Sequence, residues 1–497
     1  MVRDLMAQLD RESAERTKIQ NLLRELLDAK RNRKSEQLSE DQLALFAAAW
    51  EAQQKAAEPP PGSEGPDQQG PSAPPTASEK TVPKRGGGRQ PLAPNLKRQR
   101  IEHDLAEAEK HCATCQKDLR LIGEETSARY EYIPAQLIVV EDVCKKYACE
   151  CTIKTATKPP QPIEKSTAGA SLIAQVVVAK TVDHLPLYRQ EKIFERHGVE
   201  ISRKTMGGWL AQTAELLDPL YVAAKEVLFA SKVIGTDDTG VKVLDEKLDF
   251  ARTGRIWPYC GDAAHPVILY DYTTTRGRAG PEAFLKTYRG YLQADAYGGY
   301  DAFFKEPGRG LTEVGCWGHA RRYFYRALES DEGHMGPALF LIADLYRVEE
   351  AADGLGAEER LRLRQLESRP TLDKLRNYLE QIQAVVLPKS PAGKAVRYTL
   401  KNWAALNRYC EDGDLSIDNN ATERSIRGVA VGRNNWLFFG SDGGGKTSAV
   451  LRSFTASCQR AGVEPFAWFK DVLSRIASHP IKRIAELLPH NWAPAQA

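Results

Sequence analysis

Residues 232–244 read KVIGTDDTGVKVL, and the alternation of apolar and polar side chains along them predicts a β-strand that contains Asp237. Further elements follow closely, each marked by its own periodicity. In chain order they are a strand (RIWPYCG, 255–261), a strand (PVILYDYT, 266–273), a helix (PEAFLKTY, 281–288), a strand (GYLQADAYGGY, 290–300) and a helix within EVGCWGHARRYFYRAL (313–328). We therefore expect this segment to fold as a mixed α/β unit.

Three meandering strands followed by a helix, a strand and a helix are the order that opens a ribonuclease H-like α/β core. Asp295 lies at the end of the fourth predicted strand. Because the first and fourth strands are neighbours in that fold, we expect the carboxylates of Asp237 and Asp295 to converge.

A third carboxylate is expected on a later helix. The stretch LSIDNNATERSIRG (415–428) predicts such a helix, with Asp418 or Ser416 as its N-cap and Glu423 on it. Basic residues beside the glutamate are candidates for contacts with nucleic-acid phosphates: Arg424 and Arg427.

Together, Asp237, Asp295 and Glu423 would hold two Mg²⁺ ions, because hard cations take oxygen ligands and keep positions for water and substrate phosphate. Such a pair of ions, about 4 Å apart, clamps the attacking and leaving oxygens of an in-line phosphoryl transfer. The chain has 66 acidic residues, so other carboxylates remain open as substitutes: Asp238, Asp271 and Asp418.

Four motifs in a fixed order, TDDTGVKV, LQADAYGGYD, CWGHARRYF and DNNATERSIRG, resemble the insertion sequence sixty-six family of bacterial DDE transposases. The resemblance covers nearly the whole chain, and DNNATER is its most specific motif. It implies that Asp237, Asp295 and Glu423 are the catalytic triad. The family commonly has Asp-Glu-Thr where this chain has Asp-Asp-Thr, so Asp238 is a departure at a flanking acid.

The resemblance also implies an activity and partners. A transposase of this kind binds the ends of its element, frees a 3′-hydroxyl by metal-assisted hydrolysis and joins it to target DNA. Two ends must be held together, so a homodimer or a larger assembly is expected, and small accessory proteins encoded by the same element are implied. The rival hypothesis is a zinc/helix-turn-helix DNA-binding protein whose ribonuclease H-like fold is catalytically inert.

A Cys-x-x-His pair, Cys316 and His319, resembles an element of several transposase families with a helical insertion. Two ligands do not make a zinc site, so a structural or DNA-contacting role is expected. One hypothesis is that Trp317 stacks on a distorted base near the cut, and core packing is the equal alternative. Arg321 and Arg322 would hold phosphates.

The N-terminal part is divided by composition. Leucines at helical spacing in residues 1–50 predict an amphipathic helix, which forms a short coiled coil or packs on its own chain. The Pro/Gly/Ser/Gln-rich stretch after Glu58 is typical of a flexible linker. Glycines and cations without an acid follow, which suits a mobile arm along DNA phosphates or a solvated tether. These cations are Lys84, Arg85, Arg89, Lys97, Arg98 and Arg100.

Two thiol pairs separated by a hairpin-like stretch predict a structural zinc ribbon, in which four sulfurs close a tetrahedral site. The four expected ligands are Cys112, Cys115, Cys149 and Cys151. The second pair is C-x-C, tighter than the usual C-x-x-C, so Cys144 or His111 remains an alternative ligand and uncoordinated thiols remain an alternative state.

The stretch EKIFERHGVEISRKTMGGWLAQT (191–213) predicts two helices joined by a turn at His197-Gly198, the second opened by Ser202 as its N-cap. The pattern is typical of a DNA-reading helix-turn-helix, although many helix pairs have no such role. In a helix-turn-helix the residues facing the groove would be Arg203, Lys204 and Thr205.

Another pattern, Gly440 to Thr447, matches the phosphate loop G-x-x-x-x-G-K-T of nucleotide hydrolases. Such a loop follows the first strand of a doubly wound domain. Only 50 residues follow Thr447 and they read as helices, so the remaining sheet has no room. We therefore expect Gly443–Gly445 to form a turn before the C-terminal helices, with Lys446 as a candidate DNA contact.

The composition excludes few partners, because 69 Lys and Arg nearly balance the 66 acidic residues. The charged start of the chain and the lack of a long apolar stretch argue against a secretory signal and a membrane span. Nine cysteines without a signal favour a reducing compartment, so a soluble, cytoplasmic protein is expected.

The expected domains follow from these patterns. In order they are an N-terminal helix (1–50), a linker and basic arm (51–105), a zinc-binding region (106–160), a helix-turn-helix region (161–218), a ribonuclease H-like core (219–440) with a helical insertion at about 326–405, and a helical tail (441–497).

Overall fold

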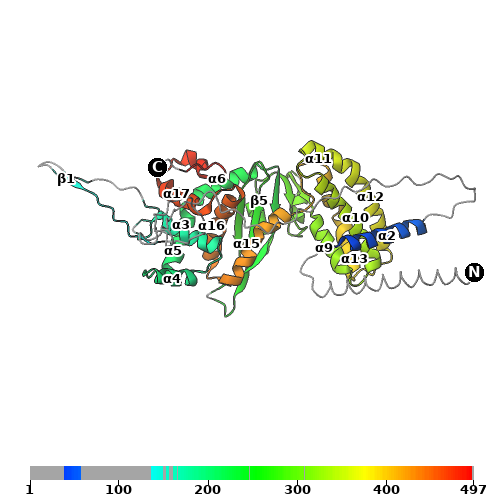
Figure 1. Ribbon diagram of the computed structural model, residues 1–497, viewed down its shortest axis with the longest axis horizontal. Helices are drawn as coiled ribbons and strands as arrows, with labels where there is room; N and C mark the ends of the chain where they lie inside the picture. Colours follow the sequence, from blue (N-terminus) through cyan, green and yellow to red (C-terminus); the bar gives the residue numbers. More distant parts are fainter. Residues whose placement is uncertain are drawn as a thin grey trace, which may run out of the picture. The chain divides into compact units, whose positions relative to one another are not determined.

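The computed structural model describes residues 38–57, 136–148, 153–155, 161–164, 166–245, 247–306 and 308–494 (Figure 1). The chain divides into two compact units, Pro60–Asp142 and the remainder. In the smaller unit only residues 136–142 are described, and they have no regular secondary structure.

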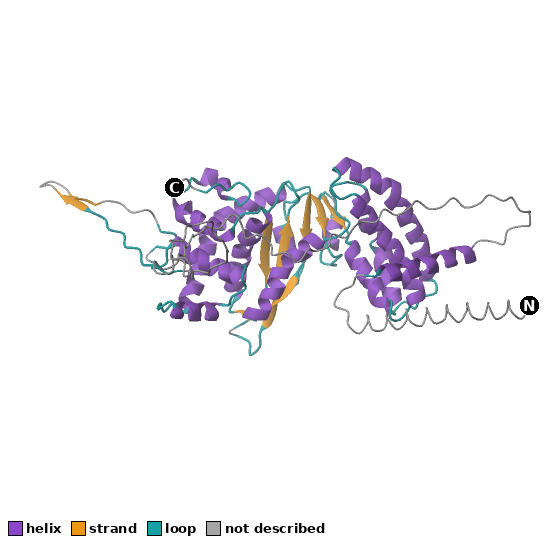
Figure 2. Ribbon diagram, in the orientation of Figure 1, coloured by secondary structure: helices purple, strands orange, loops and turns teal. Residues whose placement is uncertain are grey.

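A mixed sheet of seven short strands forms the centre of the larger unit (Figure 2). The strands are β3 (Val233–Thr236), β4 (Thr239–Val243), β5 (Arg252–Cys260), β6 (Ile268–Thr273), β7 (Gly290–Gln293), β8 (Leu311–Val314) and β9 (Phe438–Phe439). Buried and more exposed residues alternate along β4, as the apolar and polar residues alternate in the sequence.

The strand order is the one expected for a ribonuclease H-like core. Strands β3 and β4 both pair antiparallel with β5, and β6 pairs antiparallel with the opposite edge of β5. Strand β7 runs parallel to β3, and β8 runs parallel to β7. A parallel contact between β4 and β9 completes the sheet.

Two sequence expectations about the strands need correction. The single strand predicted over 232–244 is two strands, β3 and β4, which pair with β5 in one continuous register and are interrupted at Asp237 and Asp238, where the register places Pro258, which has no N–H, opposite Asp237. Asp237 therefore lies in a break between strands and not within one. The sequence reading also missed β8, whose four residues are too few to show an alternation.

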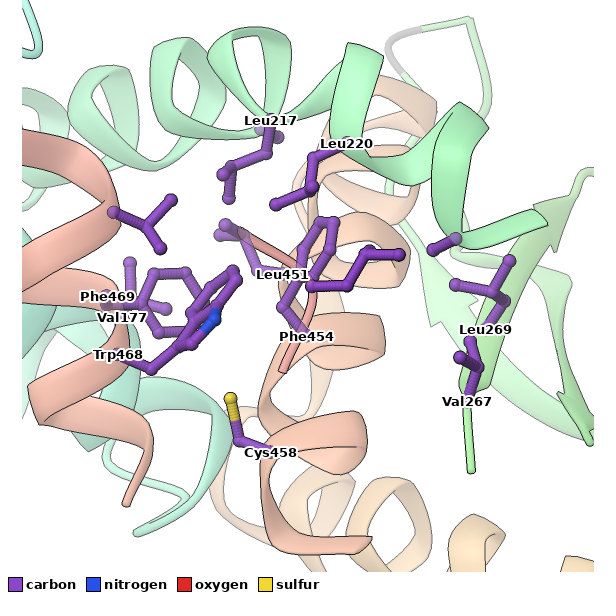
Figure 3. Close-up of a cluster of buried hydrophobic side chains, with 14 of the residues drawn as sticks. Val177, Leu217, Leu220, Val267, Leu269, Leu451, Phe454, Cys458, Trp468 and Phe469 are labelled. Carbon is purple, nitrogen blue, oxygen red and sulfur yellow. The ribbon is translucent and has the colours of Figure 1, made fainter. Parts of the chain in front are cut away.

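Helices from both ends of the core pack together beside the β6 edge of the sheet, where Ser453 and Ser457 of α16 bond the backbone of β6. They are α3 (Ala170–Thr181), α4 (Leu187–Arg196), α5 (Arg203–Leu216), α6 (Asp218–Phe229), α16 (Asp442–Arg460) and α17 (Pro465–Arg475), with 3₁₀ turns at Ile476–Ser478 and Ile481–Leu487. Figure 3 shows the apolar cluster that joins them, in which Phe454 of α16 stacks on Trp468 of α17. Trp468 is fully buried and donates its indole N–H to the carbonyl of Leu487 at 2.9 Å.

A helical subdomain stands between β8 and the helix that carries Glu423. It comprises α9 (Trp317–Ala327), α10 (Glu332–Ala351), α11 (Ala357–Leu363), a π-helical turn (Arg364–Ser368), α12 (Arg369–Gln383), α13 (Pro391–Lys401), α14 (Trp403–Asn407) and a 3₁₀ turn (Arg408–Cys410). It has its own apolar core. The buried Arg364 forms a two-pronged ion pair with Glu349, at 2.8 and 2.6 Å, and also donates to the carbonyl of Tyr409.

The helix α2 (Glu40–Ala57) packs on this subdomain. Phe46 is buried against Gly336, and Trp50 makes an edge-to-face contact with Tyr378. Two alternatives were expected for the N-terminal helix, a coiled coil or packing on its own chain. The helix α2 packs on its own chain. The leucines before residue 38 lie outside the described residues.

Several predicted features also lie outside the described residues: Lys84, Arg85, Arg89, Lys97, Arg98, Arg100, His111, Cys112, Cys115, Cys149 and Cys151. Cys144 is described and forms no disulfide. Strands β1 (Lys146–Ala148) and β2 (Ile153–Thr155) pair antiparallel, and the second thiol pair falls between them in the sequence. No described helix is both long and apolar enough to cross a bilayer.

The glycine run is helical, which corrects the expected turn. Ser441 caps α16 by accepting the N–H of Gly444, so Gly443–Gly445 occupy the first turn of the helix. A Cβ on Gly445 would come within 2.7 Å of the ring of Tyr272, so the glycine allows α16 to approach β6 closely. The helix begins directly after β9, and no phosphate-cradling loop is present at these residues.

Candidate active site

Two aspartates meet at one end of the sheet because of strand register. Gly235 of β3 pairs with Gln293 of β7 in the parallel ladder. Asp237 and Asp295 each follow two residues later, so they leave neighbouring strands at the same level. The carboxylate of Asp237 accepts the N–H of Asp238 at 2.6 Å, and that of Asp295 accepts the N–H of Tyr297 at 3.1 Å.

The helix α15 (Asn420–Trp436) brings Glu423 to the same place. Asn419 is buried and donates its side-chain amide to the carbonyl of Thr236 at 2.8 Å, which ties the start of α15 to the end of β3. A Cβ on Gly235 would lie 2.2 Å from the hydroxyl of Thr422, so this close approach requires glycine. The acids from three distant segments are therefore brought to the same end of the sheet, where the charges of Asp295 and Glu423 act on Asp237, although their ligand atoms do not all lie within 4.8 Å of one another.

The N-terminus of α15 differs from the expected one. Asn419 holds the N-cap position and makes no capping bond with its side chain. Asp418 instead accepts the N–H of Asn420 at 3.1 Å, and Ser416 bonds only the N–H of Asp418. Neither Asp418 nor Ser416 is therefore the N-cap.

The electrostatics of Asp237 reflect the clustering. Burial raises the pKa of its carboxyl from 3.8 to about 7, and the neighbouring negative charges of Asp295, Asp238 and Glu423 raise it further, against the lowering effect of the backbone hydrogen bond. Clustered carboxylates favour a bound cation, which would stabilise the ionised form.

The alternative acids have other roles in the structure. Asp238 is almost fully buried and forms ion pairs with Arg255 and Arg276, each at 2.8 Å. Asp271 lies on β6, and the charges that act on its pKa come from Lys225 and Lys446 and not from the three clustered acids. Asp418 is close to Glu423, but it is held by its hydrogen bond from Tyr346 at 3.1 Å.

Glu423 is flanked by basic groups from α9. His319 Nδ1 lies 3.5 Å from one carboxylate oxygen and Arg322 lies 3.5 Å from the other. Ligand atoms of Cys316, His319 and Glu423 all lie within 4.8 Å of one another, so the glutamate is a third group beside the Cys-x-x-His pair. Burial raises the pKa of the Cys316 thiol to about 12, and the thiol accepts the N–H of Asn419. By accepting this N–H, the thiol helps to fix the start of α15.

Trp317 is fully buried, which corrects the expectation that it stacks on a base. Its indole N–H donates to the carbonyl of Leu406 at 2.8 Å, and its ring packs edge-to-face on Trp403. No face of the ring is open to a nucleotide. Trp317 is therefore a core residue, which was the alternative hypothesis.

The other candidate DNA contacts occupy different surfaces. Arg424 and Arg427 are exposed on α15, while Arg321 and Arg322 are partly buried on α9. The helix pair forms as expected: α4 ends at Arg196, Gly198 follows in the turn with a φ of 79°, and Ser202 caps α5 by accepting the N–H of Thr205. The residues at the start of α5 are exposed: Arg203, Lys204 and Thr205.

Three features around the site could not be predicted from the sequence: the position of Arg276, the backbone conformation of Ala296 and the contact of Tyr398. Arg276 pairs with Asp238 and also stacks on the ring of Tyr297, whose N–H binds Asp295. Ala296, directly after Asp295, has a φ of 58°, a left-handed conformation that is costly for a residue with a Cβ. Tyr398 of α13 donates to the carbonyl of Asp295 at 3.2 Å and so connects the helical subdomain to the site.

The donor set fits Mg²⁺. The three clustered side chains offer carboxylate oxygens alone, while the buried oxygen of Glu423 without a hydrogen bond, Oε1, faces His319 Nδ1 at 3.5 Å. Hard cations prefer such ligands.

Comparison with known families agrees with this geometry. Residues 165–447, more than half of the chain, match the family described as "Transposase IS66 family". Residues 453–490 match the "IS66 C-terminal element". Residues 109–152, which include all four expected zinc ligands, match the "zinc-finger binding domain of transposase IS66".

Curated relatives come from Sinorhizobium fredii and are named only as uncharacterized proteins. The protein y4jD is 32% identical over 397 residues, which cover 77% of this chain and 78% of the relative. The protein y4hP is 30% identical over 446 residues, 85% of this chain and 80% of the relative. The protein y4qI is 32% identical over 412 residues, 80% and 76%. These matches confirm the resemblance, and the chain belongs to the IS66 family of DDE transposases.

Proposed function

We propose that this transposase binds the ends of an insertion sequence and catalyses Mg²⁺-dependent cleavage and strand transfer, with Asp237, Asp295 and Glu423 as the catalytic acids. The observation that carries the proposal is their convergence: two acids leave adjacent parallel strands at one level, and the third arrives on a helix fixed to the end of β3. Metal-dependent nucleic-acid hydrolysis needs such a set of oxygen ligands.

Asp237, Asp295 and Glu423 would hold two Mg²⁺ ions. Bound there, the ions would supply charge that polarises the scissile phosphate and lowers the pKa of the attacking water or 3′-hydroxyl. The protein supplies position: Asn419 fixes α15 against β3, and Tyr398 supports the backbone at Asp295. His319 and Arg322 balance part of the charge of Glu423.

DNA binding is assigned to several elements. The helix α5 reads the major groove with Arg203, Lys204 and Thr205, which are exposed at its N-terminus. Basic residues on α9 and α15, together with Lys84, Arg85 and Arg89, contact phosphates. Cys112, Cys115, Cys149 and Cys151 bind a structural Zn²⁺, which the zinc-finger match supports. Because two ends must be held together, the active form is at least a homodimer.

The test is a cleavage assay on DNA that carries the element's ends, with and without Mg²⁺. Asp237→Asn, Asp295→Asn and Glu423→Gln remove one ligand charge each and are expected to abolish cleavage. Asp271→Asn is the matched control, because it removes a partly buried acid of the same sheet outside the three-acid site. It should cleave as the wild type does.

DNA binding by the same variants separates the two functions. Glu423→Gln is expected to bind end DNA with wild-type affinity in a fluorescence anisotropy assay. If the wild type binds the ends but shows no Mg²⁺-dependent cleavage, the chain is the inert DNA-binding protein and the catalytic assignment is wrong.

A further inference from the structure

A cavity of about 610 Å³ lies behind the helix that carries Glu423. Its wall is built from α15, α16, β6 and the last residue of α3. Three arginines line it, Arg424, Arg452 and Arg460, and none of the described residues in its lining is acidic. The cavity is therefore strongly positive and belongs to no part of the three-acid site.

The cavity and the catalytic acid Glu423 lie on different faces of α15. The residues of α15 that line it are Ala421, Arg424, Ser425 and Gly428, which lie three or four apart and share one face of the helix. Glu423 lies about 100° to 160° around the same helix from each of these residues, next to the sheet break. On α16 the lining residues include Arg452, Thr455 and Gln459, while Leu451, Phe454 and Cys458 turn into the apolar cluster (Figure 3).

Arg452 is the unusual member of the lining. Its side chain is 5% exposed, and it donates to the hydroxyl of Ser448 at 3.3 Å and to the carbonyl of Thr181 at 3.2 Å. No carboxylate of the described ranges acts on its charge. A buried guanidinium without a counter-ion is costly, and proteins rarely keep one unless something neutralises it.

Neighbouring groups show the same excess of positive charge. Burial, and then the charge of Arg452, lower the pKa of Lys180 to about 8. The same two causes, in the same order, lower the pKa of His184. A Cβ built on Gly432 would meet Arg452 Nη2 and His184 Nδ1 at 3.2 Å and Trp436 Nε1 at 2.7 Å. The indole N–H of the buried Trp436 has no hydrogen-bond partner among the described residues.

The hydroxyl groups in the lining are already used as hydrogen-bond donors and are not available to bind an anion. The hydroxyl groups of Thr181, Ser425, Thr455 and Tyr270 all donate to backbone carbonyls. The donors that remain for a ligand are the amide of Gln459 and the guanidinium N–H groups that are not bound to carbonyls. Arg452 donates to the carbonyl of Thr181, and Arg460 Nη2 donates to the carbonyls of Gly261 and Asp262 at 2.6 and 3.0 Å. Guanidinium groups bind the paired oxygens of phosphate with two parallel hydrogen bonds.

We infer that this cavity is a phosphate-binding site, separate from the catalytic acids. The buried Arg452 neutralises the charge of the anion at the inner wall of the cavity, and Arg424 and Arg460 bind it at the opening. The ligand is a phosphate group, either of a DNA backbone or free in solution. The rival explanation is that Arg452 only caps the C-terminus of α3 through the carbonyl of Thr181.

The first experiment measures binding of inorganic phosphate to the full chain by isothermal titration calorimetry, at constant ionic strength in chloride and without added divalent cations. The wild type should saturate with one phosphate per chain. Arg452→Met, which keeps the length of the side chain, and Arg460→Gln should each weaken phosphate binding by about 10- to 100-fold. Lys470→Gln, which removes an exposed charge of α17 outside the cavity, should bind as the wild type does.

Arg460 is exposed, so Arg460→Gln tests the site even if Arg452→Met fails to fold. If the wild type does not saturate with phosphate, or if Arg460→Gln binds phosphate as tightly as the wild type does, the site is wrong and Arg452 has only a structural role. This outcome is independent of catalysis, because the measurement involves neither cleavage nor Mg²⁺.

A second experiment distinguishes the two sources of phosphate. Fluorescence anisotropy measures the affinity for end DNA with increasing inorganic phosphate, for the wild type and for Arg460→Gln. If the occupant is a backbone phosphate, Arg460→Gln weakens DNA binding and free phosphate competes with DNA at constant ionic strength. If DNA binding does not change while phosphate binding falls, the occupant is a free phosphate.

Discussion

Replacement of Asp237 by asparagine should stabilise the metal-free protein at neutral and alkaline pH. The pKa of this carboxyl rises from 3.8 to about 7 on folding, chiefly because the group is buried. Between these values the folded state binds more protons than the unfolded state, so stability falls as pH rises, and above about pH 7 the loss is complete. The difference corresponds to about 4 kcal/mol at pH 8 and about half of that at pH 5.5.

Asparagine has nearly the same shape and keeps the oxygen that accepts the N–H of Asp238, but it carries no charge. Urea unfolding followed by tryptophan fluorescence, without added divalent cations, should therefore place Asp237→Asn above the wild type by about 4 kcal/mol at pH 8. The advantage should shrink on acidification and vanish below about pH 4, because both states of the wild type are then protonated.

Magnesium provides the control. Mg²⁺ at pH 8 should stabilise the wild type, because the ion compensates the clustered charges, and should have little effect on Asp237→Asn. Asp271→Asn also removes a carboxyl whose pKa burial raises, but it leaves the three-acid site intact, so it should respond to Mg²⁺ as the wild type does. The reasoning fails if Asp237→Asn is no more stable than the wild type at pH 8, or if Mg²⁺ stabilises both equally.

Three other predictions follow from the packing. Gly235→Ala places a Cβ 2.2 Å from a side chain of α15, so cleavage should fall at least about 100-fold, whereas Gly333→Ala, which meets no atom within 4 Å, should cleave as the wild type does. Glu349→Gln leaves the buried Arg364 without its ion pair, and thermal unfolding should report a loss of about 3 kcal/mol; a change under 1 kcal/mol would contradict it. Lys446 lies in a helix and not in a phosphate loop, so equilibrium dialysis should detect no ATP binding by the wild type or by Lys446→Ala.

Much of the catalytic core follows from local patterns. The alternation around Asp237 and the position of Asp295 after a short strand were enough to place both acids on neighbouring strands. Glu423 followed from a helix-start pattern and a motif, because an acid on the first turns of a helix is visible in the sequence. The identity of the N-cap residue is not visible in the sequence, because the side chain of Asn419 binds the carbonyl of Thr236 instead of capping its own helix.

The features that the sequence did not predict depend on contacts between distant residues. The ion pairs of Asp238 with Arg255 and Arg276 join residues far apart in the chain, and nothing local marks them. Strand β8 is too short for a periodic signal and gains its hydrogen bonds from β7. The glycine run resembles a loop by composition, yet it is helical because Ser441 caps it and Gly445 must lie against the ring of Tyr272.

The packing of α3 on α17 links the beginning of the core to its end. A ribosome makes the first of these helices long before the second, so the growing chain carries an uncovered apolar surface until α17 has been made. Contacts this distant in sequence form late in folding. A chain that stops before α17 would therefore leave the apolar face of α3 exposed to aggregation and proteolysis.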